Sequence, residues 1–575
     1  MQESPPQSAS RSPAWLGKFF AQIREREDQV YLVLTLVIGA SVGLVVVAFI
    51  VLTERLGARL YPVGGAAWRR LLVPAIGALG TGYLLHRYAP DARGSGIPQT
   101  KAALYARGGR ITIRTVLGKF FFTSASLASG IPLGREGPSV QVGAGIASML
   151  GRRLGLSQEK VKSLIPVGGS AAVAAAFNAP LAAVLFALEE LVGDLNAPVL
   201  GSVVLSAATS WMVMRLFLGN NPLFVVPQYE FVHPSEFVIY AVLGVLGGIV
   251  SVVFVKSLLR MREWFLRLPR WSVWCQPVAG GALVGILGWF VPQVLGVGYA
   301  HVGEALNGQM ALQLMAILVL LKLVTVVTAY ASGNAGGIFG PSLFIGAMVG
   351  GALGSVAHQL FPAYTATPGA YALVGMGAAF AGIVRAPMTS VIMIFEVTHD
   401  YAVIVPLMIA NLVSFYIARK YQHEPIYGAL ALQDGIHLPA GESRNASGRL
   451  RVSQAMRASG EMFRSQERIA LVLERARGSQ FHAWPVVDEG GGLVGVVSLT
   501  VLQRAHSEGA GERPLGEILG RGAFPHVHDD HSLEVALQRL GRAGLDVIPV
   551  VSRANVRELM GLVTLGDILK EYGVG

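Results

Sequence analysis

Long apolar stretches, separated by short polar and basic runs, occupy roughly the first three quarters of this chain. Five of them approach the ~20 residues that an α-helix needs to cross a bilayer. The pattern therefore predicts spanning helices at residues 31–52, 199–218, 237–259, 273–297 and 310–330. Other apolar segments are short or broken by Gly and Pro, at residues 71–86, 116–133, 164–190, 336–360, 370–397 and 403–419. Interrupted segments are typical of transporters whose helices end inside the membrane to form a site.

Two sequence blocks occur twice, in the same order. GREGPSVQVGA at residues 134–144 and GIFGPSLFIGA at residues 337–347 share the pattern GxxGPSxxxGA at an offset of 203 residues. Residues 168–189 align without gaps to residues 375–396 at an offset of 207. Matched offsets predict an internal duplication of a unit of roughly 200 residues. Inverted repeats are common among transporters, but the number of spans per unit leaves the orientation open at this point.

Composition and charge agree with a membrane protein. Of the 575 residues, 53% are hydrophobic and 14% are charged, against about 25% charged in ordinary soluble proteins. This excludes a large water-soluble enzyme. The net charge of +11 comes entirely from residues 1–430, which carry +12, whereas residues 431–575 carry −1. The basic residues lie in short runs between apolar segments, where they set topology or attract anions, and this argues against a nucleic-acid surface.

Catalytic and metal-binding patterns are not apparent in the apolar region. Cys275 is the single cysteine, so neither a disulfide framework nor a thiolate metal cluster is expected. We find no Ser/His/Asp, His-metal or phosphate-cradling pattern there, and expect neither an enzyme nor a metal site. The chain begins with a Ser-, Pro- and Gln-rich stretch before a charge run at residues 24–28, which predicts no cleavable signal peptide and a cytoplasmic N-terminus.

The character of the chain changes after Leu430. Two units of about 60 residues follow, each with an amphipathic helix, a β-rich hairpin and a short closing helix. We therefore expect an all-α polytopic membrane domain followed by a soluble α/β tail. The expected boundaries are a cytoplasmic segment at 1–29, a membrane domain at 30–430 with halves at 30–220 and 236–430, a linker at 431–450, and tail units at 451–508 and 515–573.

Three short loops carry the candidate binding site. Each contains a glycine pair and ends in Pro, which is tolerated in the first turn of a helix. The loops are Gly94-Ser95-Gly96-Ile97-Pro98, Gly134-Arg135-Glu136-Gly137-Pro138 and Gly337-Ile338-Phe339-Gly340-Pro341. They predict helix N-termini inside the membrane, whose free N–H groups and partial positive charge favour an anion. The alternative is that Gly and Pro serve only close helix packing.

Glu136 is a candidate gate and proton carrier. A carboxylate at mid-membrane costs about 2.5–3.5 kcal/mol, so it is a functional candidate by default. Ionised Glu136 would compete with the anion for the same N–H groups, and protonation would release it. The alternative is an ion pair with Arg135.

Glu189 and Glu190 end an apolar helix and differ in their repeat partners. Glu189 matches Glu396, which predicts a structural role such as capping or pairing with backbone N–H groups. Glu190 matches Val397, so we expect Glu190 to be a second, internal proton site. The alternative for Glu190 is a solvated charge at headgroup level.

Taken together, the three loop motifs resemble those of the CLC family of chloride channels and chloride/proton exchangers. They are GSGIP at 94–98, GREGP at 134–138 and GGIFGP at 336–341, followed by a tyrosine, Tyr427, after the last membrane helix. The resemblance implies an inverted repeat and a homodimer with one anion pathway per subunit. It further implies anion coordination by the hydroxyls of Ser95 and Tyr427 and the amides of Ile338 and Phe339, with Glu136 as external gate.

A glutamate at the position of Glu190 marks many exchangers of that family, so the resemblance favours proton-coupled chloride antiport. The alternatives are an uncoupled voltage- or proton-gated chloride channel and, less favoured, a membrane-anchored nucleotide sensor. Lys119 matches a family lysine near the pathway and is expected to shape the local potential. We expect a multi-pass protein of the bacterial inner membrane with both termini in the cytoplasm.

The tail resembles a tandem pair of CBS domains. Some such pairs bind adenine nucleotides through a Thr and an Asp, and Thr564 and Asp567 in the second unit fit that spacing. The first unit has Ser498 and Val501 at the corresponding positions and lacks the acid. At most one nucleotide site is therefore expected, and no other cofactor.

Overall fold

The computed structural model describes residues 27–62, 64–195, 197–219, 223–224, 226–227, 229, 232–438, 450–457, 461–520 and 524–572. It divides into two compact units, one containing most of residues 1–430 and the other most of residues 431–575. Most of the expected cytoplasmic N-terminal segment and most of the expected linker lie outside the described residues.

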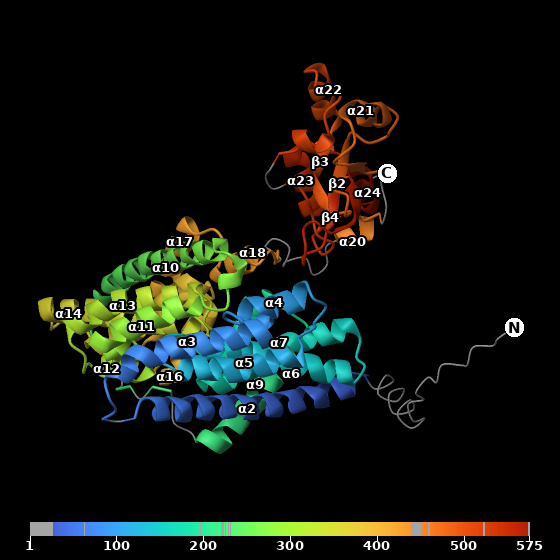
Figure 1. Ribbon diagram of the computed structural model, residues 1–575. Helices are drawn as coiled ribbons and strands as arrows, with labels where there is room; N and C mark the ends of the chain where they lie inside the picture. The colour runs from blue at the N-terminus through green and yellow to red at the C-terminus, as the bar shows by residue number, and fades with distance from the viewer. Residues whose placement is uncertain are drawn as a thin grey trace, which may run out of the picture. The chain divides into compact units, whose positions relative to one another are not determined.

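The first unit consists of helices in two halves, coloured blue to cyan and green to orange in Figure 1. The first half contains α2 (Glu27–Leu60), α3 (Trp68–Tyr88), η1 (Pro90–Ala92), α4 (Ile97–Tyr105), α5 (Ile113–Ala128), α6 (Glu136–Arg153), α7 (Gln158–Phe177), α8 (Pro180–Phe186), the π-helical turn η2 (Ala187–Val192) and α9 (Leu200–Leu218). The second half contains α10 (Glu236–Arg267), η3 (Arg270–Ser272), α11 (Pro277–Phe290), η4 (Pro292–Val294), α12 (Tyr299–Leu306), α13 (Leu312–Ala331), α14 (Phe339–Leu360), α15 (Pro368–Val384), α16 (Pro387–Thr398) and α17 (Ile404–Tyr421). Helix α18 (Ile426–Gln433) follows.

The duplication seen in the sequence is repeated in the packing. Helix α6 packs on α7 as α14 packs on α15, and α2 packs on α9 as α10 packs on α17. The two halves meet where α3 packs on α11 and α8 packs on α16. Because equivalent helices make equivalent contacts, the sequence repeat corresponds to a structural repeat.

One expected span is wrong. The sequence predicts a helix over residues 273–297, but the chain there forms only α11, with a short 3₁₀ turn on either side. Pro277 begins α11, and Val291 leaves the helical conformation before Pro292, since a residue before Pro disfavours it. Among the described residues, five helices are long and apolar enough to cross a membrane: 31–60, 200–218, 236–267, 312–331 and 339–360.

Repeat-related glycines bring the central helices into close contact. A Cβ on Gly143 would lie 2.3 Å from the carbonyl oxygen of Gly168, where α6 crosses α7. A Cβ on Gly346 would lie 2.3 Å from the carbonyl oxygen of Gly375, where α14 crosses α15. Many glycines of this chain therefore serve close backbone approach between helices, as small residues do in membrane interfaces.

Replacing Gly143 with alanine is expected to destabilise the membrane unit by about 1–3 kcal/mol, the usual cost of overpacking, because a backbone oxygen cannot move aside easily. The measurement is the thermal unfolding midpoint of purified protein in detergent. Gly80→Ala is the matched control, because Gly80 lies in helix α3 with no atom within 4 Å of an added Cβ. An equal midpoint for the two variants would contradict the close crossing.

The second unit contains two similar α/β halves. The first has α21 (Ile469–Arg477), α22 (Leu499–Ser507), η5 (Leu515–Ile518) and a sheet of β1 (Phe463–Arg464), β2 (Ala483–Val487) and β3 (Leu493–Ser498). The second has α20 (Val452–Ala455), α23 (Leu533–Ala543), α24 (Leu565–Glu571) and the antiparallel hairpin of β4 (Val547–Val551) and β5 (Leu559–Thr564). The expected mixed α/β tail is confirmed, and Val452, which begins the tail, is buried in the core of the second half.

Candidate functional site

Two of the predicted loops meet at the centre of the membrane unit. Gly134 and Gly337 are joined by two reciprocal backbone hydrogen bonds, each 2.7 Å long. Helix α6 begins two residues after Gly134 and α14 two residues after Gly337, with Pro138 and Pro341 in the first turns. The first N–H groups of an α-helix have no intrahelical partner. The two repeat-related helix N-termini are therefore held side by side, as the loop motif predicts.

The third loop packs on the start of α6. Gly96 has φ +102°, and a Cβ there would lie 2.6 Å from the carbonyl oxygen of Gly137. A Cβ on Gly137 would in turn lie 2.7 Å from both the carbonyl oxygen and the hydroxyl of Ser95. Both positions thus require glycine. Helix α4 begins at Ile97, directly after this contact, so three helix N-termini converge.

Ser95 and Tyr427 present buried hydroxyls. Both side chains have 0% exposure, and the two hydroxyls lie close to each other, without a hydrogen bond of standard geometry to any other group in the described part of the chain. A buried polar atom without a partner is uncommon and costs free energy. Ile338 and Phe339 are also buried and lie at the start of α14. These four residues offer hydroxyl and helix N-terminal donors, the chemistry that an anion requires.

Glu136 lies over the two glycine loops. It is the first residue of α6 and 1% exposed, and its Oε1 accepts a hydrogen bond from the Tyr299 hydroxyl. A Cβ on Gly134 would lie 2.2 Å from Glu136 Oε2, and one on Gly340 would lie 3.3 Å from it. The glycines therefore leave room for the carboxylate beside the N-terminus of α14.

Arg135 does not pair with Glu136. Its guanidinium lies 3.2 Å from Glu54 Oε1 and 5.9 Å from the centre of the Tyr299 ring. The alternative explanation of Glu136, an ion pair with its neighbour, is therefore wrong, since adjacent residues at the start of a helix point in different directions.

Tyr299 is a site residue that the sequence analysis missed, although the repeat contains the signal. Gly296-Val297-Gly298-Tyr299 lies 202 residues after Gly94-Ser95-Gly96-Ile97, so Tyr299 is the repeat equivalent of Ile97. The glycines of both turns have positive φ, and a short helix follows each turn, α4 after the first and α12 after the second. The second turn is followed by a phenol that donates to Glu136, whereas the first turn contains the buried hydroxyl of Ser95.

Two buried lysines support these equivalent turns. Lys119 and Lys322 are repeat partners with 0% exposure, and each ammonium donates to two carbonyl oxygens of the preceding turn. The acceptors are Ala92 (3.0 Å) and Gly94 (2.5 Å) for Lys119, and Val294 (3.1 Å) and Gly296 (2.6 Å) for Lys322. Lys119 therefore fixes the backbone before Ser95, a role more specific than the electrostatic one predicted.

Glu190 is buried and ion-paired. It lies on the π-helical turn η2 with 4% exposure, and its Oε1 is 2.6 Å from Lys101 Nζ. The alternative of a solvated headgroup charge is therefore wrong. Lys101 lies on α4, the helix that begins two residues after Ser95, so Glu190 contacts the short helix that follows the first glycine loop. The sequence analysis missed Lys101.

Glu189 and Glu396 cap each other's repeat-equivalent helices. Glu189 accepts from the backbone N–H groups of Met388 (3.3 Å) and Thr389 (2.8 Å), at the start of α16. Glu396 accepts from Leu181 (2.9 Å) and Ala182 (2.7 Å), at the start of α8. The predicted structural role of Glu189 is confirmed, and the pairing joins the two halves.

In the tail, Thr564 and Asp567 form a capping box at the start of α24. The Thr564 hydroxyl donates to Asp567 Oδ2 at 2.8 Å, and Arg457 Nε donates to Asp567 Oδ1 at 2.8 Å. Burial alone would raise the pKa of Asp567, but the hydrogen bonds from Arg457 and Thr564 lower it below its usual value. Both predicted nucleotide-binding residues therefore already have protein partners.

Comparison with known proteins identifies the family. The family model described as "Voltage gated chloride channel" matches residues 76–419. The chain belongs to this family. A CBS domain model matches residues 516–573, the second half of the tail.

Named relatives of this CLC protein include exchangers. The H(+)/Cl(-) exchange transporter ClcA of Vibrio campbellii is 34% identical over 354 residues, covering 60% of this chain and 76% of the relative. That of Vibrio parahaemolyticus is 33% identical over 366 residues, covering 63% and 78%. Among solved structures, a slow cyanobacterial Cl−/H+ antiporter matches with TM-score 0.65 and 29% identity over 70% of this chain and 97% of that chain. A eukaryotic CLC transporter matches with TM-score 0.63 and 20% identity over 93% and 97%, which shows the fold alone.

Proposed function

We propose that this protein exchanges chloride for protons across a membrane. The observation that carries the proposal is the buried Glu136 carboxylate at two converging helix N-termini, together with the buried hydroxyls of Ser95 and Tyr427, which have no other partner of standard geometry among the described residues. An ionised carboxylate and an anion compete for the same donors, so protonation of Glu136 frees the site for chloride. Relatives named as H(+)/Cl(-) exchangers support this reading.

In the proposed mechanism chloride is coordinated by four residues: Ser95, Tyr427, Ile338 and Phe339. Glu136 is the outer gate, and Glu190 is the inner proton site. Neutral donors hold a dehydrated anion without binding it too tightly for passage. Lys101 Nζ occupies Glu190 Oε1 at 2.6 Å, so proton transfer at that oxygen requires this contact to open. In this mechanism the proposed inner proton site therefore contacts α4, the helix that begins after the proposed chloride ligand Ser95.

Reconstitution into proteoliposomes tests the proposal. An imposed chloride gradient is expected to drive uphill proton movement, and Glu190→Gln is expected to abolish proton flux while chloride flux continues. Glu189→Gln is the control, because Glu189 caps α16 and has no assigned transport role. Chloride flux without proton movement in the parent protein would favour the uncoupled channel instead.

We further propose a homodimer in the bacterial inner membrane with both termini cytoplasmic, as the family resemblance implies. Adenine nucleotide is a proposed ligand of the tail at Thr564 and Asp567. Such a ligand would have to displace Arg457 from Asp567, because the ion pair occupies Oδ1. Calorimetry of the full chain with ATP, ADP and AMP tests this, and no heat with any of them would contradict it.

A further inference from the structure

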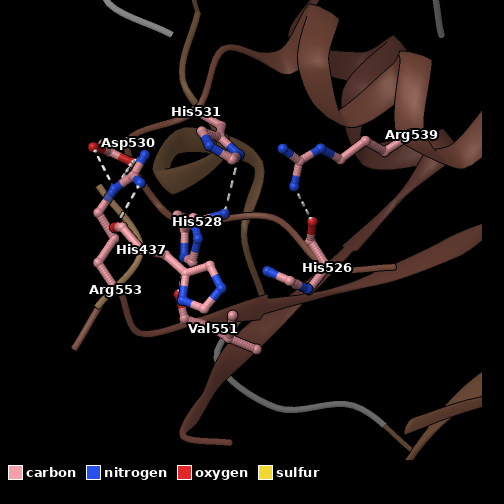
Figure 2. A network of polar contacts seen from close by, with 8 residues as sticks. All are labelled: His437, His526, His528, Asp530, His531, Arg539, Val551 and Arg553. Atoms are coloured by element: carbon pink, nitrogen blue, oxygen red, sulfur yellow. Dashed lines mark hydrogen bonds and ion pairs between the residues drawn. The ribbon is translucent and has the colours of Figure 1, made fainter. Parts of the chain in front are cut away.

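Four histidines of the second unit gather where residue 437 meets the segment before α23. His437, His526, His528 and His531 form a contiguous group, which we call the imidazole cluster (Figure 2). The ring centres of His526 and His528 are 5.3 Å apart, and those of His528 and His531 are 5.1 Å apart. His437 completes the group at 5.8 Å from His526 and 6.1 Å from His528. Twelve histidines occur in the chain, so a third of them lie here.

The cluster holds a segment of chain that continues directly from α18. We call residues 434–438 the strap. The strap backbone is fixed by Arg553, whose carbonyl oxygen accepts from His437 N (3.2 Å) and whose Nη1 donates to His437 O (3.1 Å). Arg553 is itself 5% exposed and makes a bidentate ion pair with Asp530 at 2.6–2.9 Å. Figure 2 shows the His437 ring lying against those of His526 and His528.

The charged groups that border the cluster act in both directions: the arginines favour neutral imidazoles and the aspartates favour protonated ones, but Asp530 is already paired with Arg553. The strap contributes Asp434; the loop before α23 contributes Asp529 and Asp530; α23 contributes Arg539 and Arg542; and the segment after β4 contributes Arg553. Arg539 Nη1 donates to His526 O at 2.6 Å, so its positive charge lies beside the rings. Asp530 is engaged by Arg553, as Figure 2 shows.

The hydrogen bonds of the rings also fit neutral imidazoles. His528 Nδ1 lies 2.9 Å from Val551 O and His526 Nδ1 lies 2.9 Å from Phe524 O, which makes both Nδ1 atoms donors. His531 Nδ1 accepts from His528 N at 3.2 Å, so a proton there would break the bond. His437 Nδ1 is buried and has no partner among the residues that the structure describes. Added protons would therefore lack acceptors or displace existing donors.

Burial, followed by the charge of Arg553, lowers the pKa of His528 to about 3 and that of His531 to about 2, from 6.5. The pKa values of His437 and His526 are lowered by burial as well. We call the cluster closed when the strap is bound to it and open when the strap is released. An imidazole whose pKa is lowered in the closed cluster stays neutral there and gains a proton only when the cluster opens. The closed cluster is therefore stable above pH 6.5 and loses stability as the pH falls below it. Among the described residues, no set of three His, Cys, Asp or Glu side chains is arranged to hold a metal ion.

We propose that the imidazole cluster is a regulatory proton-binding site, at which protons taken up on acidification of the tail side release the strap and slow transport. The strap leads without a break into α18, whose second residue is Tyr427, the proposed chloride-coordinating phenol. Release of the strap frees the C-terminal end of α18, and the Tyr427 hydroxyl loses its fixed position. Only this last step rests on the proposed transport function; proton binding and strap release stand without it.

Hydrogen exchange of the full-length protein, corrected for intrinsic exchange, tests the first step. The opening constant of the strap is expected to rise at least about 30-fold between pH 6.5 and pH 5.5, because two or more imidazoles gain protons on opening. His528→Gln is expected to reduce that rise, and His437→Gln, at a partly exposed position, supplies the same test if the first variant does not fold. His506→Gln, an exposed tail histidine outside the cluster, is the control. A pH-independent opening constant, or equal slopes in all variants, would overturn proton binding.

Chloride transport in proteoliposomes tests the second step. Lowering the pH on the tail side from 7.5 to 5.5 is expected to slow transport at least twofold in the parent protein and in His506→Gln, and to have less effect in His437→Gln. A parent protein whose strap opens with acid while its transport rate does not change would overturn the regulatory role. A protein that fails to transport at any pH contradicts the proposed function, while the exchange experiment still decides proton binding.

Discussion

Replacing Glu136 with glutamine is expected to abolish proton transport while chloride transport continues. The amide keeps the shape of the side chain but carries no titratable proton, so the exchange of a carboxylate for an anion at the helix N-termini can no longer be coupled to protonation. Proton flux driven by a chloride gradient should fall to the leak of protein-free vesicles. In the parent protein chloride flux should rise as the outer pH falls, because protonation releases the carboxylate, whereas the variant should show a flat pH profile.

Glu54→Gln is the matched control for this change. Glu54 is the ion-pair partner of Arg135, the residue before Glu136, and its side chain is 66% exposed. The control thus makes the same substitution, Glu to Gln, near the gate but outside it. The control is expected to keep coupled transport, because exposed ion pairs contribute little. Proton flux that survives in Glu136→Gln would show that another group carries the proton, and the gate would then have to be assigned elsewhere.

Much of this site follows from local sequence rules. A glycine pair followed by Pro restricts where a helix can begin, so the starts of α4, α6 and α14 could be predicted from three short loops. The reciprocal caps of Glu189 and Glu396 could be anticipated because both residues occupy one repeat position. A span over residues 273–297 was predicted wrongly, since hydropathy averages over Pro277, where α11 begins, and Pro292, before which α11 ends, and both limits hold however apolar the neighbouring residues are.

The residues that the sequence analysis missed depend on contacts between distant segments. Lys101 and Glu190 are 89 positions apart, and no local pattern predicts that their side chains meet. Lys322 and Tyr299 are different, because they lie at the repeat equivalents of Lys119 and Ile97. Extending the repeat alignment beyond its most similar blocks would have identified both. Alignment of the two repeats therefore locates the equivalent turns. The side chains at those turns differ between the halves, as Tyr299 and Ile97 do.

Replacing Tyr299 with phenylalanine is expected to weaken the closed position of Glu136. The phenol donates to Glu136 Oε1, and a hydrogen bond to a charged group contributes about 1.5–3 kcal/mol. Its loss should reduce the occupancy of the closed gate about 10- to 150-fold relative to the open gate. The ring should stay in place, because it contacts Phe224 at 5.7 Å and Arg135 at 5.9 Å and neither contact needs the hydroxyl.

The rate of chloride efflux from proteoliposomes, with the proton flux recorded alongside, measures the effect. Where opening of the gate limits transport, Tyr299→Phe should transport chloride faster than the parent protein. It should also move fewer protons per chloride, because a gate that opens without protonation uncouples the two ions. Tyr229→Phe is the matched control: its phenol is also buried and donates to Leu306 O at 2.5 Å, at the far end of α12. Tyr229→Phe should lose stability without a change in coupling. Equal coupling in the two variants would mean that Tyr299 supports α12 and does not hold the gate.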